Sequence, residues 1–234
     1  MILGIYGRSK SGKTTLVESL ASSLTADGFS VATVKHIKQE GFTIDTEDKD
    51  TWRHSKAGAG LVVASSDEET SFIVKSTMDI GKITDMIEKN FDFDIILVEG
   101  FKGSSMPKVA VGDIDEVENT VFRYTDNEEE IVDYLKSKLE FERVYNSLPL
   151  LDCEDCGMTC AGFADKVCSG KSNVEDCKHY GKKSICLTVD GKGIPMKKFP
   201  AEFFGNAVSA MLKSLRGVGD FKDATIELKG PGGD

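Results

Sequence analysis

Eight residues near the N-terminus have the types and spacing of a loop that binds phosphate groups. Residues 7–14 are Gly-Arg-Ser-Lys-Ser-Gly-Lys-Thr, which matches the pattern G-x-x-x-x-G-K-[ST]. In this pattern the backbone N–H groups surround the phosphate oxygens, and the helix that follows adds its positive end. Lys13 can reach the β- and γ-phosphates, and the Thr14 hydroxyl can bind Mg²⁺. The residues expected to bind the nucleotide are Gly7, Ser9, Ser11, Gly12, Lys13, Thr14 and Thr15.

The residues on either side of this loop fit the context that phosphate binding requires. Residues 1–6 form an apolar run that is typical of a buried strand. Behind the loop, leucines recur with helical spacing at Leu16, Leu20 and Leu24. Strand, glycine loop and helix follow in the required order, which disfavours the alternative of a surface turn beside an unrelated lysine.

An acidic residue at the end of another buried strand is the expected partner of the loop. Residues 95–98 are apolar and lead directly into Glu99. The carboxyl ends of parallel strands meet at one edge of a sheet, so a carboxylate there can orient a metal ion or its water. Aspartate is the commoner residue at this position, and a solvated loop acid is the alternative interpretation of Glu99.

Strand and helix patterns alternate over the first 142 residues. Further strands are expected at 29–34, 61–64, 72–74, 109–111 and 120–123, with helices at 51–56, 80–87 and 131–139. This alternation predicts an α/β fold resembling P-loop NTPases, with a mostly parallel, doubly wound sheet. Residues 1–142 are therefore expected to form one nucleotide-binding domain.

The cysteines indicate a second domain with different chemistry. All six lie between Cys153 and Cys186, and the first 152 residues contain none. We expect residues 142–149 to be a connector and residues 150–234 to form a cysteine-rich domain with a C-terminal α/β extension. Such clustering favours metal or redox chemistry over a disulfide framework.

Four of these cysteines have the spacing of metal ligands. Cys153, Cys156 and Cys160 lie within eight residues, and Cys177 follows after a gap of sixteen. Three closely spaced thiolates and a distant fourth favour a 4Fe–4S cluster, whereas zinc is more often bound by two separated pairs; zinc and simple structural thiols stay open as alternatives. Cys168 and Cys186 are expected to be small buried residues.

Composition limits the classes of partner. The chain has 234 residues and a net charge of −10, which argues against a nucleic-acid or anionic-membrane surface. Apolar runs fall well short of the roughly 20 residues of a membrane span. The N-terminus has no pattern of an export signal, so we expect a cytoplasmic protein.

Several short motifs, taken in order, resemble one family of nucleotide-binding proteins. After the phosphate loop come Lys-His at 35–36, Asp-Thr-Trp-Arg-His at 50–54, and Glu-Gly-Phe-Lys at 99–102. This set resembles the molybdopterin-guanine dinucleotide biosynthesis protein B (MobB) family over residues 1–140. The resemblance implies a GTP-binding, weakly hydrolysing homodimer that helps a guanylyltransferase to attach GMP to molybdopterin. Members often carry further histidines after Lys-His, where this chain has Ile37.

This resemblance suggests roles for the motif residues. Lys13, Asp50, Arg53 and Glu99 are the candidates for GTP hydrolysis: an arginine can stabilise phosphate charge, and a carboxylate can position water or metal. Lys102, with Lys108 as a weaker candidate, suits a second anion such as the pterin phosphate, although solvated surface lysines are the default. His36 and His54 fit a structural role equally well.

The cysteine segment has a resemblance of its own. Residues 153–177 resemble the small 4Fe–4S domain of corrinoid iron–sulfur proteins, with three residues instead of the usual four between Cys156 and Cys160.

Two other functions of the chain stay open: a nucleotide-gated ATPase for electron transfer or metallocentre maturation, and a scaffold that binds nucleotide in order to dock a nucleotidyltransferase.

Overall fold

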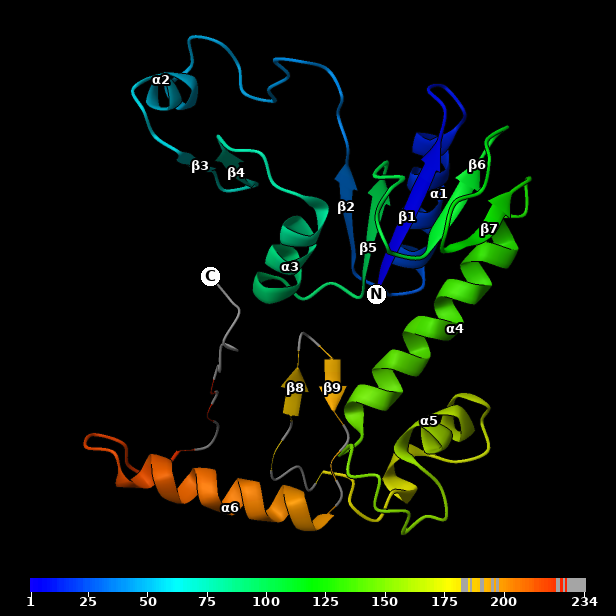
Figure 1. Cartoon of the computed structure of the whole chain (residues 1–234), viewed down its shortest axis with the longest axis vertical. Helices are drawn as coiled ribbons and strands as arrows, with labels where there is room; N and C mark the ends of the chain where they lie inside the picture. Colours follow the sequence, from blue (N-terminus) through cyan, green and yellow to red (C-terminus); the bar gives the residue numbers. More distant parts are fainter. Residues whose placement is uncertain are drawn as a thin grey trace. The chain divides into compact units, whose positions relative to one another are not determined.

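The computed structural model divides the chain into two compact units, Met1–Leu139 and Glu140–Asp234 (Figure 1). The structure describes residues 1–181, 185, 187–189, 192–194, 196, 198–221, 224 and 226. Within these residues, no helix combines the length and the apolar composition needed to cross a membrane.

The centre of the first unit is a five-stranded sheet in which all the pairings are parallel. The strands lie in the order β2 (Val31–Lys35), β5 (Ile95–Glu99), β1 (Ile2–Gly7), β6 (Lys108–Val111) and β7 (Thr120–Tyr124). This confirms the expected P-loop NTPase-like α/β fold. The three middle strands are nearly continuous apolar runs because both of their faces are buried.

Helices α1 (Lys13–Ala26) and α4 (Glu128–Ser147) supply the apolar side chains that pack on one face of this sheet. Side chains alternate across a strand, so every second residue of the middle strands points toward these helices. The strands contribute Leu3, Ile5, Ile95, Leu97, Val109 and Val111, and the helices contribute Leu16, Leu20, Leu24, Ile131, Leu135 and Leu139. Each such leucine or isoleucine stabilises the fold by about 1.5–3 kcal/mol.

The expected strands at 61–64 and 72–74 form a hairpin that is separate from the main sheet. Strands β3 (Leu61–Ser65) and β4 (Thr70–Val74) pair only with each other, in antiparallel orientation. The short turn between them permits no parallel crossover. Helix α2 (Asp50–Lys56) precedes the hairpin, and α3 (Ile80–Asn90) follows it.

The second unit contains the cysteines. Its elements are α5 (Cys160–Cys168), a 3₁₀ turn at Val174–Asp176, strands β8 (Leu187–Val189) and β9 (Lys192–Ile194), and α6 (Lys198–Ser214). Leu148, Leu150, Cys160, Phe163 and Ala164 form its small core, with Cys156 and Cys177 packed against them. Residues 142–147 of the expected connector are the last turns of α4, and Val144 and Tyr145 on these turns contact the core.

Cys168 differs from its expected state. It lies at the end of α5, where it is exposed, because Val167 and Phe163 take the inward positions of this helix. The expectation of a small buried residue is therefore wrong for Cys168. Cys186 lies outside the described residues.

Lys108 also differs from expectation. Lys108 is the first residue of β6, and its side chain is only 1% exposed. This burial excludes both a solvated surface lysine and the suggested anion-binding role. Its ammonium group donates to the carbonyl oxygens of Met106, at 3.1 Å, and Glu118, at 2.9 Å. Lys108 thus joins the loop before β6 to the loop before β7.

We expect Lys108→Met to destabilise the protein by about 1–3 kcal/mol, because the Met106 and Glu118 carbonyls would lose a buried donor while the apolar stem is kept. Urea unfolding followed by circular dichroism measures this loss. Lys38→Met, a change at an exposed lysine, is the matched control and should leave the unfolding curve unchanged. Equal stability of the two variants would show that the buried ammonium group contributes nothing.

Candidate functional site

The phosphate loop connects β1 to α1 at the carboxyl edge of the sheet. Gly7 ends β1, where the chain passes so close to β6 that a Cβ atom would lie 2.3 Å from the Val111 carbonyl oxygen and 2.6 Å from Ser11 Oγ. No side chain fits there. The first glycine of the motif is therefore required by close packing of the backbone.

The N-terminal end of α1 can accept an anion. Gly12 is its capping residue, and neither a capping side chain nor a first-turn acid neutralises this end of the helix. Within the described residues, Ser11 Oγ is buried without a hydrogen-bond partner, which is uncommon for a hydroxyl group. Backbone N–H groups and the helix dipole thus face the space above the loop.

Three polar groups meet at the start of α1. Thr14 Oγ1 donates to Glu99 Oε2 at 3.0 Å, and the Lys35 ammonium group donates to Thr14 Oγ1 at 3.2 Å. Lys35 Nζ is also 3.1 Å from Glu99 Oε2. Hydroxyl and carboxylate oxygens are ligands that Mg²⁺ prefers, and here they already surround a cation. The donor set therefore fits a hard divalent metal ion.

The sheet register brings these groups together. Glu99 at the end of β5 lies opposite Lys35 on β2 and opposite Ile5 on β1. It follows Ile95 and Leu97 by even spacing, so its side chain points to the face that α1 covers. The sequence predicted the position of Glu99 at the loop, but it gave no role to Lys35.

Two neighbouring cavities open at this edge. The first, of about 480 Å³, is lined by Ser9, Lys10, Ser11, Gly12, Lys13, Thr14, Thr15, Lys35 and Glu99. It thus contains every residue expected to bind the nucleotide except Gly7, which lines the second cavity. Lys13 Nζ is 2.5 Å from the Arg8 carbonyl oxygen of the loop itself.

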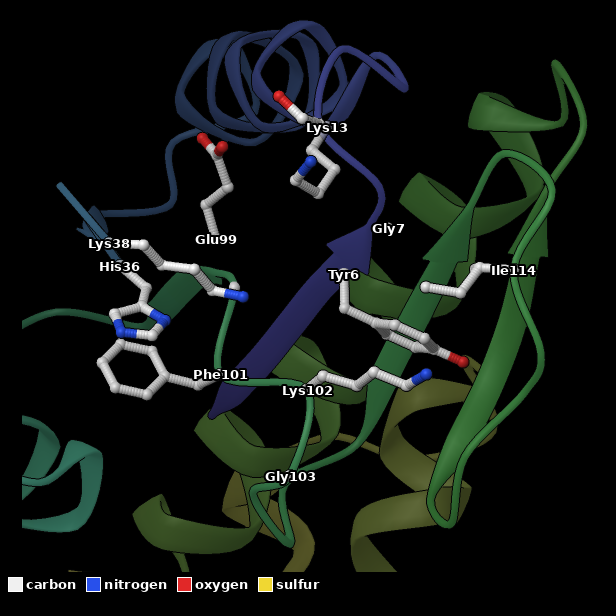
Figure 2. Close-up of a pocket in the computed structure, with 12 residues that line it drawn as sticks. Tyr6, Gly7, Lys13, His36, Lys38, Glu99, Phe101, Lys102, Gly103 and Ile114 are labelled. Carbon is white, nitrogen blue, oxygen red and sulfur yellow. The ribbon is translucent and has the colours of Figure 1, made fainter.

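The second cavity, of about 650 Å³, shares Ser9, Lys13 and Glu99 with the first (Figure 2). Figure 2 shows His36 and Phe101 at one side, with Lys102 stretched along the Tyr6 ring below. The Lys102 ammonium group is 5.8 Å from the centre of that ring. This cavity therefore combines aromatic rings with cationic groups next to the phosphate loop.

A stacked pair of rings forms the side of this second cavity. The rings of His36 and Phe101 are 4.3 Å apart and nearly parallel, at 19°. Gly100 has φ 105°, and a Cβ atom on it would lie 2.7 Å from His36 Cβ, so glycine is needed for the approach. Phe101 itself has φ 49°, a rare conformation for a bulky residue. Sequence analysis missed this pair, although the adjacent motifs contain both rings.

The structure does not bring Asp50 and Arg53 to the loop. Both lie on α2, as the helical prediction required, and form an exposed ion pair of 3.5 Å. Neither they nor His54 on the same helix is among the residues that line the two cavities. Their catalytic role stays a prediction.

The cysteine segment forms a tightly wound loop with free thiols. Asp152, Glu154 and Gly157 all have positive φ, at 42°, 59° and 82°. The Asp152 N–H group donates to Cys160 Sγ at 3.4 Å, and burial raises the pKa of the Cys160 thiol. N–H groups aimed at sulfur are among the groups that tune iron–sulfur clusters. Of the expected ligands, Cys156, Cys160 and Cys177 pack in one core, with the Cys153 thiol also free.

A second group of ligand atoms lies beside these thiols. The ligand atoms of Cys153, Asp155 and His179 are all within 4.8 Å of one another, and His179 Nε2 is 2.7 Å from Asp155 Oδ2. This combination of sulfur, nitrogen and oxygen could hold a single transition-metal ion such as zinc. Sequence analysis missed His179, although it lies two residues after Cys177.

Comparisons with known proteins give one family match for the first part of the chain and another for the cysteine segment. Residues 2–133 match the family model described as "Molybdopterin guanine dinucleotide synthesis protein B". Residues 148–179 match a model described as "Putative Fe-S cluster". The second match supports an iron–sulfur domain in general, not the narrower resemblance to corrinoid iron–sulfur proteins.

One curated relative extends over nearly the whole chain, and others match a part of it. A protein of Methanocaldococcus jannaschii, named "Putative molybdopterin-guanine dinucleotide biosynthesis adapter protein", is 30% identical over 97% of both chains. The adapter protein of Haemophilus influenzae is 37% identical over 46% of this chain and 61% of its own length. The crystal structure of Bacillus subtilis MobB covers 58% of this chain and 96% of its own, with 22% identity and a TM-score of 0.48. The family match and the full-length relative establish that the chain belongs to the MobB family.

Proposed function

We propose that this chain is an adapter of molybdopterin guanine dinucleotide synthesis that binds GTP with Mg²⁺ and hydrolyses it slowly. The observation that carries the proposal is the meeting of Thr14 and Glu99, 3.0 Å apart, at the N-terminal end of α1. A phosphate loop supplies the anion site, and this pair supplies two oxygens for the metal ion. The family name, which contains guanine dinucleotide, supports GTP as the nucleotide.

In this proposal the backbone and the side chains of the loop bind different parts of the nucleotide phosphates. Backbone N–H groups from Gly7 to Thr15 surround the phosphates, and Lys13 leaves the Arg8 carbonyl to contact the β- and γ-phosphates. Magnesium, when bound, neutralises the phosphate charge. Within the described residues, the loop cavity is lined by no arginine or glutamine that would stabilise or orient a hydrolytic transition state, which supports slow turnover. Asp50 and Arg53 are the candidates to complete the site, if α2 moves toward it.

The second cavity is the proposed place of molybdopterin. A pterin is a planar ring system, and the stacked His36 and Phe101 rings offer it a flat surface. Lys102 and Lys38, which also line this cavity, suit its phosphate. Because Lys13 and Glu99 line both cavities, the pterin and the nucleotide would lie next to each other, as the guanylyltransferase reaction requires. The proposed assembly is a homodimer that works with that guanylyltransferase.

The proposed group of the second unit is a 4Fe–4S cluster on Cys153, Cys156, Cys160 and Cys177. A four-iron cluster stands between its thiolates, so these need not crowd as closely as the ligands of one ion. The wound loop at residues 152–157 and the N–H group aimed at Cys160 support this set. Its chemistry, when bound, would be one-electron transfer or structural stabilisation.

Lys13→Ala tests nucleotide binding at the loop. Loss of a charge-assisted contact of about 1.5–3 kcal/mol should weaken GTP binding by roughly tenfold to a hundredfold. Isothermal titration calorimetry measures the dissociation constant, with Lys89→Ala on α3 as an exposed control that should bind like the wild type. Unchanged binding in Lys13→Ala, or a clear preference of the wild type for ATP, would contradict the proposal.

Anaerobic purification with metal analysis tests the cluster. We expect about four irons per chain in the wild type and loss of most of that iron in Cys177→Ser. Cys168→Ser is the matched control, since this thiol is exposed and lies outside the small core, and it should retain full iron. About one zinc per chain, kept in Cys177→Ser but lost in His179→Ala, would instead favour the site of Cys153, Asp155 and His179.

A further inference from the structure

The Lys35 ammonium group occupies the position between the two oxygens that would bind magnesium. It lies 3.2 Å from Thr14 Oγ1 and 3.1 Å from Glu99 Oε2. Magnesium binds oxygen at about 2.0–2.1 Å and demands near-octahedral geometry. An ammonium group bonded to the same two oxygens therefore competes with the metal ion for one position.

We propose that Lys35 is an internal substitute for magnesium: it holds the metal position whenever the ion is away and yields it when the ion binds. This inference rests on the proposed binding of a nucleotide at the phosphate loop. The ammonium group neutralises Glu99 and keeps Thr14 and Glu99 at a separation from which both can bind a metal ion. The loop can then take up a nucleotide before magnesium arrives, because a positive charge already faces the phosphates.

Differences in exposure support an exchange of this kind. The Lys35 side chain is 54% exposed, whereas that of Glu99 is only 13% exposed. The flexible lysine stem can therefore swing into solvent without disturbing the core, while the carboxylate stays in place. In the structure, the Lys13 ammonium group does not contact Thr14 or Glu99 but donates to the Arg8 carbonyl oxygen.

The neighbouring charges make the competition specific to Lys35. The loop cavity is lined by the cations Lys10, Lys13 and Lys35 and, within the described residues, by one acid, Glu99. Of these cations, the described contacts pair Lys35 with the carboxylate and Lys13 with a carbonyl oxygen. Removing the Lys35 charge should therefore change how strongly nucleotide binding depends on magnesium.

The test compares Lys35→Met with the wild type by titrating a fluorescent, non-hydrolysable GTP analogue, once in excess Mg²⁺ and once in EDTA. In EDTA, we expect the variant to bind the analogue about threefold to fivefold more weakly, the size of one exposed charge interaction. In excess Mg²⁺ the two proteins should bind nearly alike, because the metal ion has displaced the lysine. The Mg²⁺ concentration for half-saturation of the nucleotide complex should fall by a similar factor in Lys35→Met.

Two controls separate the charge from other effects of the substitution. Lys35→Arg keeps the charge and should retain the EDTA binding of the wild type, whereas Lys89→Met, at an exposed lysine of α3, should change neither titration. An equal loss in Mg²⁺ and in EDTA would make Lys35 an ordinary phosphate contact and overturn the inference, as would no loss in either. If the wild type bound no nucleotide in Mg²⁺, the proposed function itself would fail. If the wild type bound nucleotide and Lys35→Met showed the same magnesium dependence, only the inference about Lys35 would fail.

Discussion

The parallel pairing of β5 between β1 and β2 is the constraint on which the whole site depends. It brings the carboxyl ends of three strands to one edge, with Glu99 directly opposite both Ile5 and Lys35. The phosphate loop leaves β1 at this edge and leads into α1, whose first turn carries Thr14. The apolar side chains beneath, such as Leu3 and Leu97, favour this register, which places the polar groups above them at one edge of the sheet.

Charge is distributed unevenly in this acidic chain. The net charge is −10, yet among the residues that the structure describes, the two cavities at the sheet edge are lined by five lysines, Lys10, Lys13, Lys35, Lys38 and Lys102, and by one acid, Glu99. Anions are therefore attracted to one small area and repelled by much of the remaining surface. That contrast suits a protein whose two proposed ligands, a nucleotide and a phosphorylated pterin, are both small anions.

The helices, the strands and the phosphate loop could be predicted from the sequence because they follow from local patterns. The leucine spacing of α1, the glycine-lysine motif and the apolar strand that leads to Glu99 each lie within one short segment of the sequence. Contacts between distant segments were missed: the His36–Phe101 stack and the bond from Lys35 to Thr14 depend on strand order. Lys108 was misjudged for a related reason, since its buried carbonyl partners come from loops that only the folded sheet brings together. The prediction that Cys168 is buried was wrong because the apolar spacing of a helix does not show which of its residues other segments cover.

Reconstitution of the reaction that this protein is proposed to assist tests the proposed function most directly. A molybdopterin guanylyltransferase, molybdopterin and limiting GTP with Mg²⁺ are incubated with and without this protein, and the guanine dinucleotide formed is measured by chromatography. We expect faster formation with the protein present and no acceleration when the phosphate loop is inactivated. Equal rates with and without the protein, at GTP concentrations where its loop is shown to be occupied, would contradict the proposed function.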